Sequence, residues 1–476
     1  MTRLTVLSVE EIEAIHQATL RILCNTGILM TEPKGLEILT EAGAVLAGSH
    51  QNLRVLLPAD LVEKEVARCP ASVSIRGRAG GTKVLGDGSL HWHNLGGARC
   101  VHNARDDQRQ PATLQDVRDS TRLLDAMNSA TTIVPMFTPQ DVPGPLMSLA
   151  MYRNALPFTT KPLQGPGIQN AREVHYILRM AELMGPPHEV LSLSVSPVSP
   201  LTFPEEAVQA IVEIARQGIP FAPLPCPTAG ATAPCSIAGA LAQQNAEILA
   251  AIVLAQLVKP GLPIVYCGRL AMMEPRTGLS VWGGVELGLA SAATVQVGHR
   301  YGLPVNVYGF STNSHTLDLQ NGFERAMNAA IPALAGADEL SGIGEMEAGV
   351  TSSFTQIVCD NEIAASVHRL RRGFVVNEDS LAVDVIDAVL GGTRNFLGQR
   401  HTTKFLRSGE MLITHLAERR SWESWDREGK VGMVERAKAE AERLLVEHQV
   451  DPLDDIQEHE LDAIFESARK ELVKRN

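Results

Sequence analysis

Short apolar runs alternate with longer amphipathic stretches along most of this chain. Each run has the length of one β-strand, and each stretch repeats its apolar residues at the spacing of one helix face. The predicted strands cover residues 95–102, 132–138, 158–164, 190–197, 219–225, 263–268, 304–310 and 339–344. The predicted helices follow them in turn, over residues 114–127, 145–156, 171–184, 204–217, 236–258, 285–301, 319–335 and 354–372.

Turns of the form Gly-x-Pro separate several of these helices from the next strand, at residues 218–220, 261–263 and 302–304. Glycine ends a helix and proline opens the following strand. Eight strand-then-helix units in series predict an α/β fold, a (β/α)8 TIM barrel. Neither GxGxxG nor GxxxxGK[ST] opens any of the helices, which argues against a Rossmann or P-loop fold.

The two ends of the chain depart from this alternation. Residues 1–90 combine three helical patterns with a Gly-rich, β-like stretch and predict an N-terminal α+β lead-in. Residues 91–395 carry the predicted barrel. Residues 396–476 predict a C-terminal helical extension whose last two helices mix acidic and basic residues, as solvated helices do.

Composition restricts the classes of function. The chain has 476 residues and a net charge of −12 with no cluster of Lys and Arg, which argues against nucleic acid as a partner. The N-terminus lacks the order of a signal peptide, and the apolar runs are too short or too interrupted to predict a membrane span. Seven scattered cysteines without a CxxC pair indicate a reducing, cytoplasmic location.

Candidate chemistry gathers where the seventh predicted strand stops, because loops after parallel strands form the working face of such folds. The loop reads S-T-N-S-H-T-L-D, and His315 is its candidate catalytic residue, with helix capping as the structural alternative. Asn313 and Ser314 are candidate substrate donors or turn residues, and Gln320 lies in the first turn of the next helix. Asp318 is expected to cap that helix.

Two further features surround this loop. Glu345 and Glu347 share a face if the eighth strand continues, so both are candidates to reach a cavity. Aromatic residues form only 4% of the chain, yet six lie at or near predicted strand ends, where they are candidates for binding a cation by their π faces or for filling the core. They are Phe137, Tyr266, Trp282, Tyr308, Phe310 and Phe354.

Other chemistries find less support. His91 and His93 share a strand face, but no further metal ligand is identifiable, so no metal site is predicted. The cysteines near strand ends lack a recognisable histidine partner for a thiolate nucleophile. Lys161 is the one lysine at a strand end, which disfavours a Schiff-base lyase or aldolase.

Several stretches together resemble the trimethylamine methyltransferase superfamily, nearly from end to end. They include ALAQQNAEILAAIVLAQLVKPGLPIVY, DLQNGFERAM, MEAGVTSSFTQIVCDNEI, GGTRNFLGQRHTTKFLR and SWESWDREGK. The resemblance implies a (β/α)8 barrel and a corrinoid-dependent methyltransferase. It also implies that no cofactor is tightly bound, because cob(I)alamin is supplied by a partner corrinoid protein. A homo-oligomer is expected.

One departure from the superfamily narrows the expected substrate. Members that demethylate trimethylamine carry pyrrolysine in the loop after the seventh strand, whereas this sequence has none and places His315 at or beside that position. The chain therefore resembles the branch whose known members demethylate quaternary amines such as glycine betaine. A quaternary ammonium leaves as a neutral tertiary amine, so catalysis needs mainly positioning.

The carboxylate of a betaine needs a donor, and the candidates are Asn313, His315, Arg269 and Arg276. Glycine betaine, giving dimethylglycine, is the best guess for the substrate. The alternatives are carnitine, proline betaine or γ-butyrobetaine, or a module that binds a betaine or the corrinoid protein without catalysis.

Overall fold

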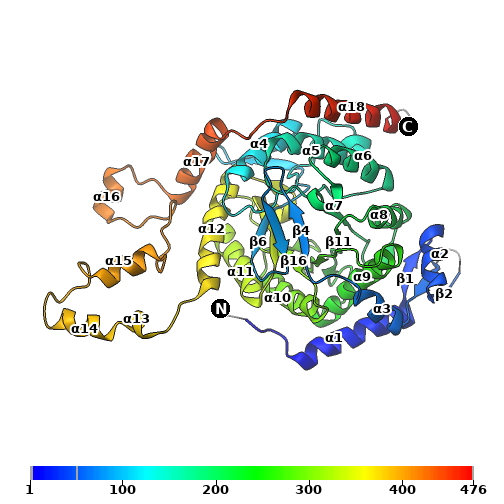
Figure 1. Ribbon diagram of the computed structural model, residues 1–476, viewed down its shortest axis with the longest axis horizontal. Coiled ribbons are helices and arrows are strands. Elements are labelled where there is room, and N and C mark those ends of the chain that lie inside the picture. Colours follow the sequence, from blue (N-terminus) through cyan, green and yellow to red (C-terminus); the bar gives the residue numbers. More distant parts are fainter. Residues whose placement is uncertain (1–3, 50–51, 474–476) are drawn as a thin grey trace.

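The computed structural model describes residues 4–49 and 52–473, and it is an α/β fold in which helices surround a central set of short, mostly parallel strands (Figure 1). One parallel sheet has the order β13 (Tyr266–Cys267), β16 (Val305–Tyr308), β17 (Glu339–Ile343), β6 (His91–Asn94). β9 (Leu193–Val195) and β11 (Phe221–Pro223) form a second parallel pair.

Isolated contacts link these sheets to the two remaining strand segments. Parallel bridges join Phe221 to Ile264 and Ile133 to Leu163. Backbone hydrogen bonds run from Gly165 N to Ser192 O at 3.0 Å and from Thr131 N to Trp92 O at 3.0 Å. Residues 132–138 and 158–164 thus pair as predicted but form no regular strand. Each contains one proline, Pro135 or Pro162, which lacks the N–H that a strand ladder needs.

The first predicted strand was misplaced. The strand that pairs with β17 is His91–Asn94, and the chain turns at Gly96–Gly97 before β7 (Cys100–Asn103) joins β8 and β19 in a separate sheet. The sequence allowed a strand face at His91 and His93 but placed the first strand of the barrel at residues 95–102, after the polar segment His-Trp-His-Asn. This segment is buried because His93 and Asn94 both find hydrogen-bond partners inside the protein.

The eight predicted helices all form, and two have the predicted limits. They are α4 (Leu114–Ala126), α5 (Met147–Ala155), α6 (Ala171–Glu182), α8 (Glu205–Arg216), α9 (Ile237–Val258), α10 (Val285–Arg300), α11 (Leu319–Ala335) and α12 (Phe354–Arg372). The Asp318 side chain accepts from Asn321 N and caps α11, as predicted.

α9 is long and apolar enough to cross a membrane, but 83% of its most apolar window is buried inside the protein. Several of its polar side chains are hydrogen-bonded there. Glu247 accepts from Ser199 Oγ at 2.7 Å and from Leu201 N at 2.8 Å, and Asn245 donates to Thr19 and Tyr301. α9 is therefore a core helix in which Asn245 and Glu247 have hydrogen-bond partners.

The N-terminal residues pack against the outside of this body. α1 (Val9–Arg21) and α3 (Ala59–Val66) lie on α9. The N-terminal residues also form a small sheet, which includes β10 (Thr202–Phe203) at one edge. It also contains β1 (Ile28–Met30), β2 (Val45–Ala47) and β3 (Arg54–Leu56), with α2 (Pro33–Glu41) between the first two. The β4–β5 hairpin (Val73–Arg76 and Thr82–Leu85) covers the amino ends of the central strands, where Val73, Ile75 and Leu85 pack on Val265.

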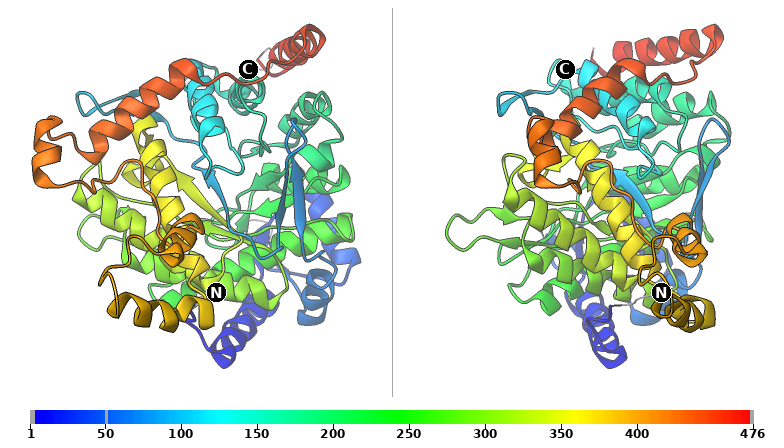
Figure 2. Two further views of the ribbon diagram at one scale, coloured as in Figure 1. Left: turned by 60° about the vertical axis from the view of Figure 1, so that its left-hand side comes forward. Right: turned by 90° about the vertical axis from the view of Figure 1, so that its left-hand side faces the viewer.

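The remaining elements lie in loops or at the C-terminus. One is the short helix α7 (Pro187–Val190). The others are the short strands β8 (Gln108–Pro111), β12 (Thr228–Ala229), β14 (Ala271–Met273), β15 (Ser280–Val281), β18 (Glu345–Met346) and β19 (Thr351–Ser352). After α12 come α13 (Glu378–Leu381), α14 (Val383–Leu390), α15 (Arg400–Arg407), α16 (Trp422–Arg427), α17 (Met433–Glu447) and α18 (Asp455–Leu472). α17 and α18 return to the body, whereas α13–α16 project from it (Figures 1 and 2).

Candidate functional site

A cavity of about 320 Å³ lies among the central strands, between the β4–β5 hairpin and the loops at the carboxyl ends of the strands. Side chains of a strand alternate between its two faces. His93, Cys267, Asn306, Tyr308 and Glu339 accordingly line the cavity. The strand residues beside them, including Trp92, Tyr266 and Leu340, pack outward in the hydrophobic core.

A buried ion pair forms the floor of this cavity. Lys83, on the β4–β5 hairpin, donates from Nζ to Glu339 Oε1 at 2.6 Å, and both side chains are almost fully buried. Burial alone would raise the pKa of Glu339, but Lys83 and neighbouring donors hold it down to about 2. Glu339 is therefore a carboxylate at neutral pH, neutralised by Lys83.

Asn306 extends this floor toward the carboxyl ends of the strands. Its Nδ2 donates to Glu339 Oε2 at 2.6 Å and lies 2.9 Å from His93 Nε2. Since an amide nitrogen only donates, His93 Nε2 accepts and the ring proton sits on Nδ1, which donates to Asn94 O at 2.7 Å. Burial lowers the pKa of His93 to about 4, so the ring is neutral at neutral pH.

Arg269 is the cavity's other cation. Its Nη1 donates to Gly268 O and Asn306 O at 3.1 Å each, and its Nη2 donates to Asn306 Oδ1. Its guanidinium carbon lies 4.7 Å from the centre of the Tyr308 ring. All these hydrogen bonds go to uncharged oxygens. Arg269 thus brings a positive charge to the cavity wall that no hydrogen-bonded carboxylate neutralises.

The cavity wall contains no activated nucleophile. Burial raises the pKa of the Cys267 thiol to about 11 and that of Tyr308 well above its usual value, so both stay protonated at neutral pH. His93 is neutral, but its acceptor nitrogen is occupied by Asn306. The arrangement can hold and orient a small polar molecule, with no side chain poised to attack it.

The loop at residues 311–318 is held firmly at the rim of the cavity. Thr312 Oγ1 donates to Glu324 Oε2 at 2.6 Å, and Asn313 N donates to the same oxygen at 2.9 Å. Asn313 Oδ1 accepts from Trp282 N and from Gly283 N at 2.7 Å each, and Ser314 Oγ bonds Asp318. Of the two predicted donors, Asn313 uses its side chain to hold the neighbouring loop at residues 280–283, and Ser314 bonds within its own loop.

His315 projects outward from this loop. Its side chain is 78% exposed, and its Nδ1 lies 3.6 Å from Glu347 Oε1. Glu347 is half-buried, pairs with Arg109 and accepts from Thr351 Oγ1 at 2.5 Å. His315 and Glu347 are thus brought together, at the rim and outside the cavity wall.

Glu345 points into the protein interior, whereas Glu347 lies at the rim. Glu345 is buried, its Oε1 accepts from Ser311 Oγ at 2.8 Å, and its Oε2 has no hydrogen-bond partner within residues 4–49 and 52–473. Burial raises the pKa of Glu345 to about 8, so this carboxyl group is mostly neutral at neutral pH.

Of the aromatic candidates, only Tyr308 lines the cavity. Trp282 meets Tyr308 edge-on, with ring centres 5.0 Å apart, and supports it from outside. Tyr266 points outward and donates to Asn245 Oδ1 at 2.9 Å, and Phe310 stacks on Trp92. Phe354 packs near Phe137, with ring centres 6.1 Å apart.

Two further candidates lie away from the cavity. The side chain of Arg276 is 92% exposed in the loop between β14 and β15, 3.9 Å from Glu274. Gln320 is exposed on α11 and donates to Glu324 Oε1 at 2.9 Å. Arg269, the other arginine that the sequence left open, is the one that reaches the cavity.

Sequence reasoning did not single out Lys83, Asn306 or Glu339. Asn306 and Glu339 occur inside apolar strands, where a buried polar residue needs a partner, and this was the available signal. Lys83 gave no signal, because a hairpin lysine is ordinarily solvated. Lys161 donates to the backbone oxygens of Leu124 and Met127, away from the cavity. Among residues 4–49 and 52–473, no three His, Cys, Asp or Glu side chains are grouped to hold a metal ion.

The fold and the cavity together define an α/β protein with an internal polar site for one small molecule. A model of the trimethylamine methyltransferase (MTTB) family matches residues 1–473, so the chain belongs to that family and is a methyltransferase. This confirms the resemblance found in the sequence.

Several relatives span nearly the whole chain. The trimethylamine methyltransferase MttB of Desulfitobacterium hafniense (strain DSM 10664 / DCB-2) is 30% identical over 93% of this chain and 90% of its own. The MttB of Methanosarcina barkeri is 31% identical over 98% and 96%. The glycine betaine methyltransferase of Desulfitobacterium hafniense (strain Y51) is 28% identical over 99% and 98%.

A solved structure supports the fold. The crystal structure of the Methanosarcina barkeri monomethylamine methyltransferase (MtmB) superposes with a TM-score of 0.52. The two chains are 13% identical over 98% of this chain and 88% of that one. At this identity the likeness concerns the fold alone.

Proposed function

We propose that this protein transfers a methyl group from a small quaternary amine that carries a carboxylate to cob(I)alamin on a separate corrinoid protein. Glycine betaine is the best candidate, and dimethylglycine is then the released product. Membership of the family supports methyl transfer. The chemistry of the cavity supports a substrate that carries a carboxylate.

Arg269 is the observation that carries this proposal. The floor pair Lys83–Glu339 is neutral as a unit, and His93 is uncharged, so Arg269 leaves the cavity wall positive. A substrate with only an ammonium group would meet an unfavourable charge, whereas a betaine brings a carboxylate for the guanidinium. Tyr308 presents an aromatic face beside it.

The absence of an activated nucleophile from the cavity wall fits a quaternary substrate. Its leaving group is a neutral tertiary amine, so neither protonation nor covalent capture of the nitrogen is required. The protein's task is to hold one N–CH3 bond in line with the arriving acceptor, which is catalysis by positioning. The sequence supports this, since the loop carries His315 at or beside the position where relatives acting on trimethylamine are expected to have pyrrolysine.

The carboxyl ends of the strands offer a surface for the corrinoid protein. Exposed large apolar side chains in the loops and helix starts there include Val198, Leu279, Val285, Leu319 and Val350. Exposed apolar side chains on one side of a protein are available to contact a partner protein. The acceptor corrinoid would be presented from this side.

The scaffold inferred for this chemistry is a (β/α)8 barrel over residues 91–395, with a lead-in at 1–90 and an extension at 396–476. The parallel sheet β13–β16–β17–β6, the pair β9–β11 and the linking bridges follow the order that such a barrel requires.

Following the cobalt spectrum of a reduced corrinoid protein mixed with this enzyme and glycine betaine tests the proposal. We expect loss of the cob(I)alamin bands only when enzyme and substrate are both present. Carnitine, proline betaine, γ-butyrobetaine and trimethylamine define the substrate range. Binding of a betaine without spectral change for any donor would favour a non-catalytic module.

A further inference from the structure

Residues 373–432 leave the body of the protein as an arm. The arm carries α13, α14, α15 and α16, joined by extended segments, and Figure 1 shows it projecting beyond α12 on the left. It begins at the end of α12 and returns at α17. We refer to residues 373–432 as the arm.

The arm exposes an unusual share of apolar surface. Nearly half of the large hydrophobic side chains that are exposed among the described residues lie on it, while its only buried ones are Val389 and Leu416. Those in and around α13–α15 are Phe374, Val375, Val376, Leu381, Val383, Ile386, Leu390, Phe396, Leu397 and Leu406. Monomers rarely leave apolar patches larger than about 300–600 Å² in water, so this surface indicates a partner.

The exposed residues of α14 form one stripe. Val383, Ile386 and Leu390 recur at the spacing of a single helix face, and Asp384 and Asp387 lie beside them. A helix with an apolar stripe and acidic flanks has the pattern of a packing helix, although none of the described residues of its own chain buries the stripe.

The charges of the arm are divided between its two halves. α13 and α14 contain the acidic residues Glu378, Asp379, Asp384 and Asp387 and no basic ones. α15 contains Arg400, Lys404 and Arg407 and no acidic residue. Within one chain, Lys404 pairs with Asp379, whereas Arg400, Arg407, Asp384 and Asp387 are exposed and form no ion pair in the described part of the chain.

Such a surface is complementary to itself. A two-fold interface sets the same patch of two copies against each other in reverse order, so an acidic half meets a basic half. Opposite charges at the border of an apolar contact then select this pairing and its direction. A different protein would have to carry the same division of charge by coincidence.

The two ends of the arm, after α12 and before α17, are called its roots, and they leave the cavity entrance free. Near the first root, Trp92 Nε1 donates to His368 at 2.8 Å and Arg371 donates to Gly88 O at 3.0 Å, which places this root at the amino end of β6. A molecule that delivers the methyl acceptor approaches the opposite, carboxyl ends of the strands.

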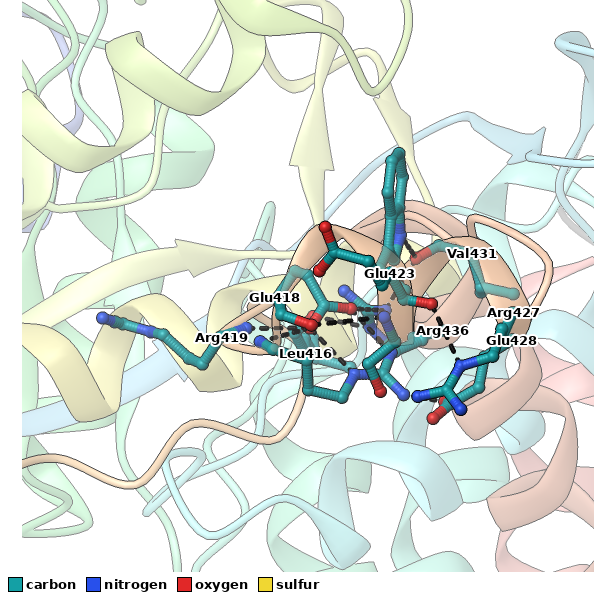
Figure 3. Close-up of polar contacts among 12 residues, drawn as sticks. Leu416, Glu418, Arg419, Glu423, Arg427, Glu428, Val431 and Arg436 are labelled. Carbon is teal, nitrogen blue, oxygen red and sulfur yellow. Dashed lines mark hydrogen bonds and ion pairs between the residues drawn. The ribbon is translucent and has the colours of Figure 1, made fainter.

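The second root is fixed by polar contacts (Figure 3). Arg436, on α17, donates from Nε to Leu416 O at 2.7 Å and from Nη1 to Val431 O at 2.7 Å, and Glu418 accepts from Arg436 and Arg420. This end of the arm is therefore satisfied within one chain, in contrast to the apolar residues of α13–α15.

We infer that the arm is the interface with a second copy of this chain, with the acidic α13–α14 of each copy against the basic α15 of the other. The apolar residues of the two arms are buried between the copies. A stable interface of standard size buries roughly 800 Å² on each partner, and the exposed side chains of the arm are numerous enough to supply it. The pairing does not depend on the proposed methyl transfer.

Two charge-reversed variants test this inference by light scattering after gel filtration. In one variant Asp384→Lys and Asp387→Lys make the arm basic, and in the other Arg400→Glu and Arg407→Glu make it acidic. We expect the unaltered chain to have at least twice the single-chain mass of 51.3 kDa. Each variant alone is expected at the single-chain mass, and an equimolar mixture should restore the larger species.

The control carries the same change elsewhere, as Asp60→Lys with Glu206→Lys on the exposed surface of α3 and α8. It should keep the oligomer, and circular dichroism should show all chains folded. A single-chain mass for the unaltered protein at tens of micromolar would overturn the inference. So would an oligomer that survives both reversals, or variants that fail to associate when mixed.

Discussion

Lys83 reaches from a hairpin at the amino ends of the central strands and donates to Glu339 at 2.6 Å on the cavity floor. The two residues are 256 positions apart in sequence, and each is nearly inaccessible to water. Glu339 in turn accepts from Asn306, whose amide oxygen holds Arg269. Through Asn306, this ion pair therefore fixes the position and orientation of the Arg269 guanidinium, which is the group proposed to bind substrate.

Breaking this pair is expected to destabilise the protein strongly. Lys83→Met leaves the Glu339 carboxylate buried without its cation, a change that costs about 3–5 kcal/mol. The free energy of unfolding in urea measures it. The double variant Lys83→Met with Glu339→Gln should recover part of the loss, because no charge remains buried. Equal losses in both variants would show that the packing of Lys83, and not its charge, matters.

Arg269→Met is expected to raise the KM for glycine betaine and lower kcat/KM about 10- to 100-fold, since a hydrogen bond between charged groups contributes about 1.5–3 kcal/mol. Arg269→Lys should keep part of the activity, since it retains charge but loses the fork of donors. Arg276→Met at the exposed loop is the matched control and should behave as the unaltered enzyme. Unchanged kinetics in Arg269→Met would remove the main support for a betaine substrate.

His315→Ala is expected to lower methyl transfer while the free energy of unfolding changes by less than about 0.5 kcal/mol, as for other exposed positions. The reason is its place on the rigid rim loop, near the path of substrate and acceptor. Steady-state rates and thermal unfolding give the two measurements, with the exposed His188→Ala as control. If turnover is unaffected, His315 is a surface residue of the loop.

The pKa of His93 gives the stability a dependence on pH. Burial lowers this pKa to about 4, below the value of about 6.5 in an unfolded chain, so the unfolded state takes up a proton first as the pH falls. Stability from this group is full above about pH 6.5 and is lost on acidification toward pH 4. His93→Gln, which retains an acceptor for Asn306, should show a flatter profile between these limits. Parallel profiles would mean that other groups cause the slope.

Much of the architecture followed from the sequence alone. All eight predicted helices form, and α11 and α12 have the predicted limits, because helix periodicity, the Asp318 cap and the Gly-x-Pro turns are local signals. The first central strand was predicted at residues 95–102 instead of His91–Asn94, because the strands were identified as apolar runs and His91–Asn94 is mostly polar. Its burial depends on partners such as Asn306, which is more than 200 residues away.

Only part of the candidate site could be predicted from the sequence. The loop after β16 and the arginine after β13 were found, since strand ends of an α/β fold are where binding groups lie. The sequence did not show which side chains enter the cavity, because alternate residues of a strand point to opposite faces and the inward-facing set was not known. Tyr308 faces inward, whereas Tyr266 packs outward against α9.

The sequence by itself determined the family, the order of strands and helices, and the lack of a pyrrolysine in the rim loop. These properties are local or shared along the whole chain. Only the tertiary structure decided that Arg269 and not Arg276 carries the cavity's charge, and that Lys83 neutralises Glu339. Ion pairs and cavities join residues that are distant in sequence, and their energies depend on burial, which a linear pattern does not contain.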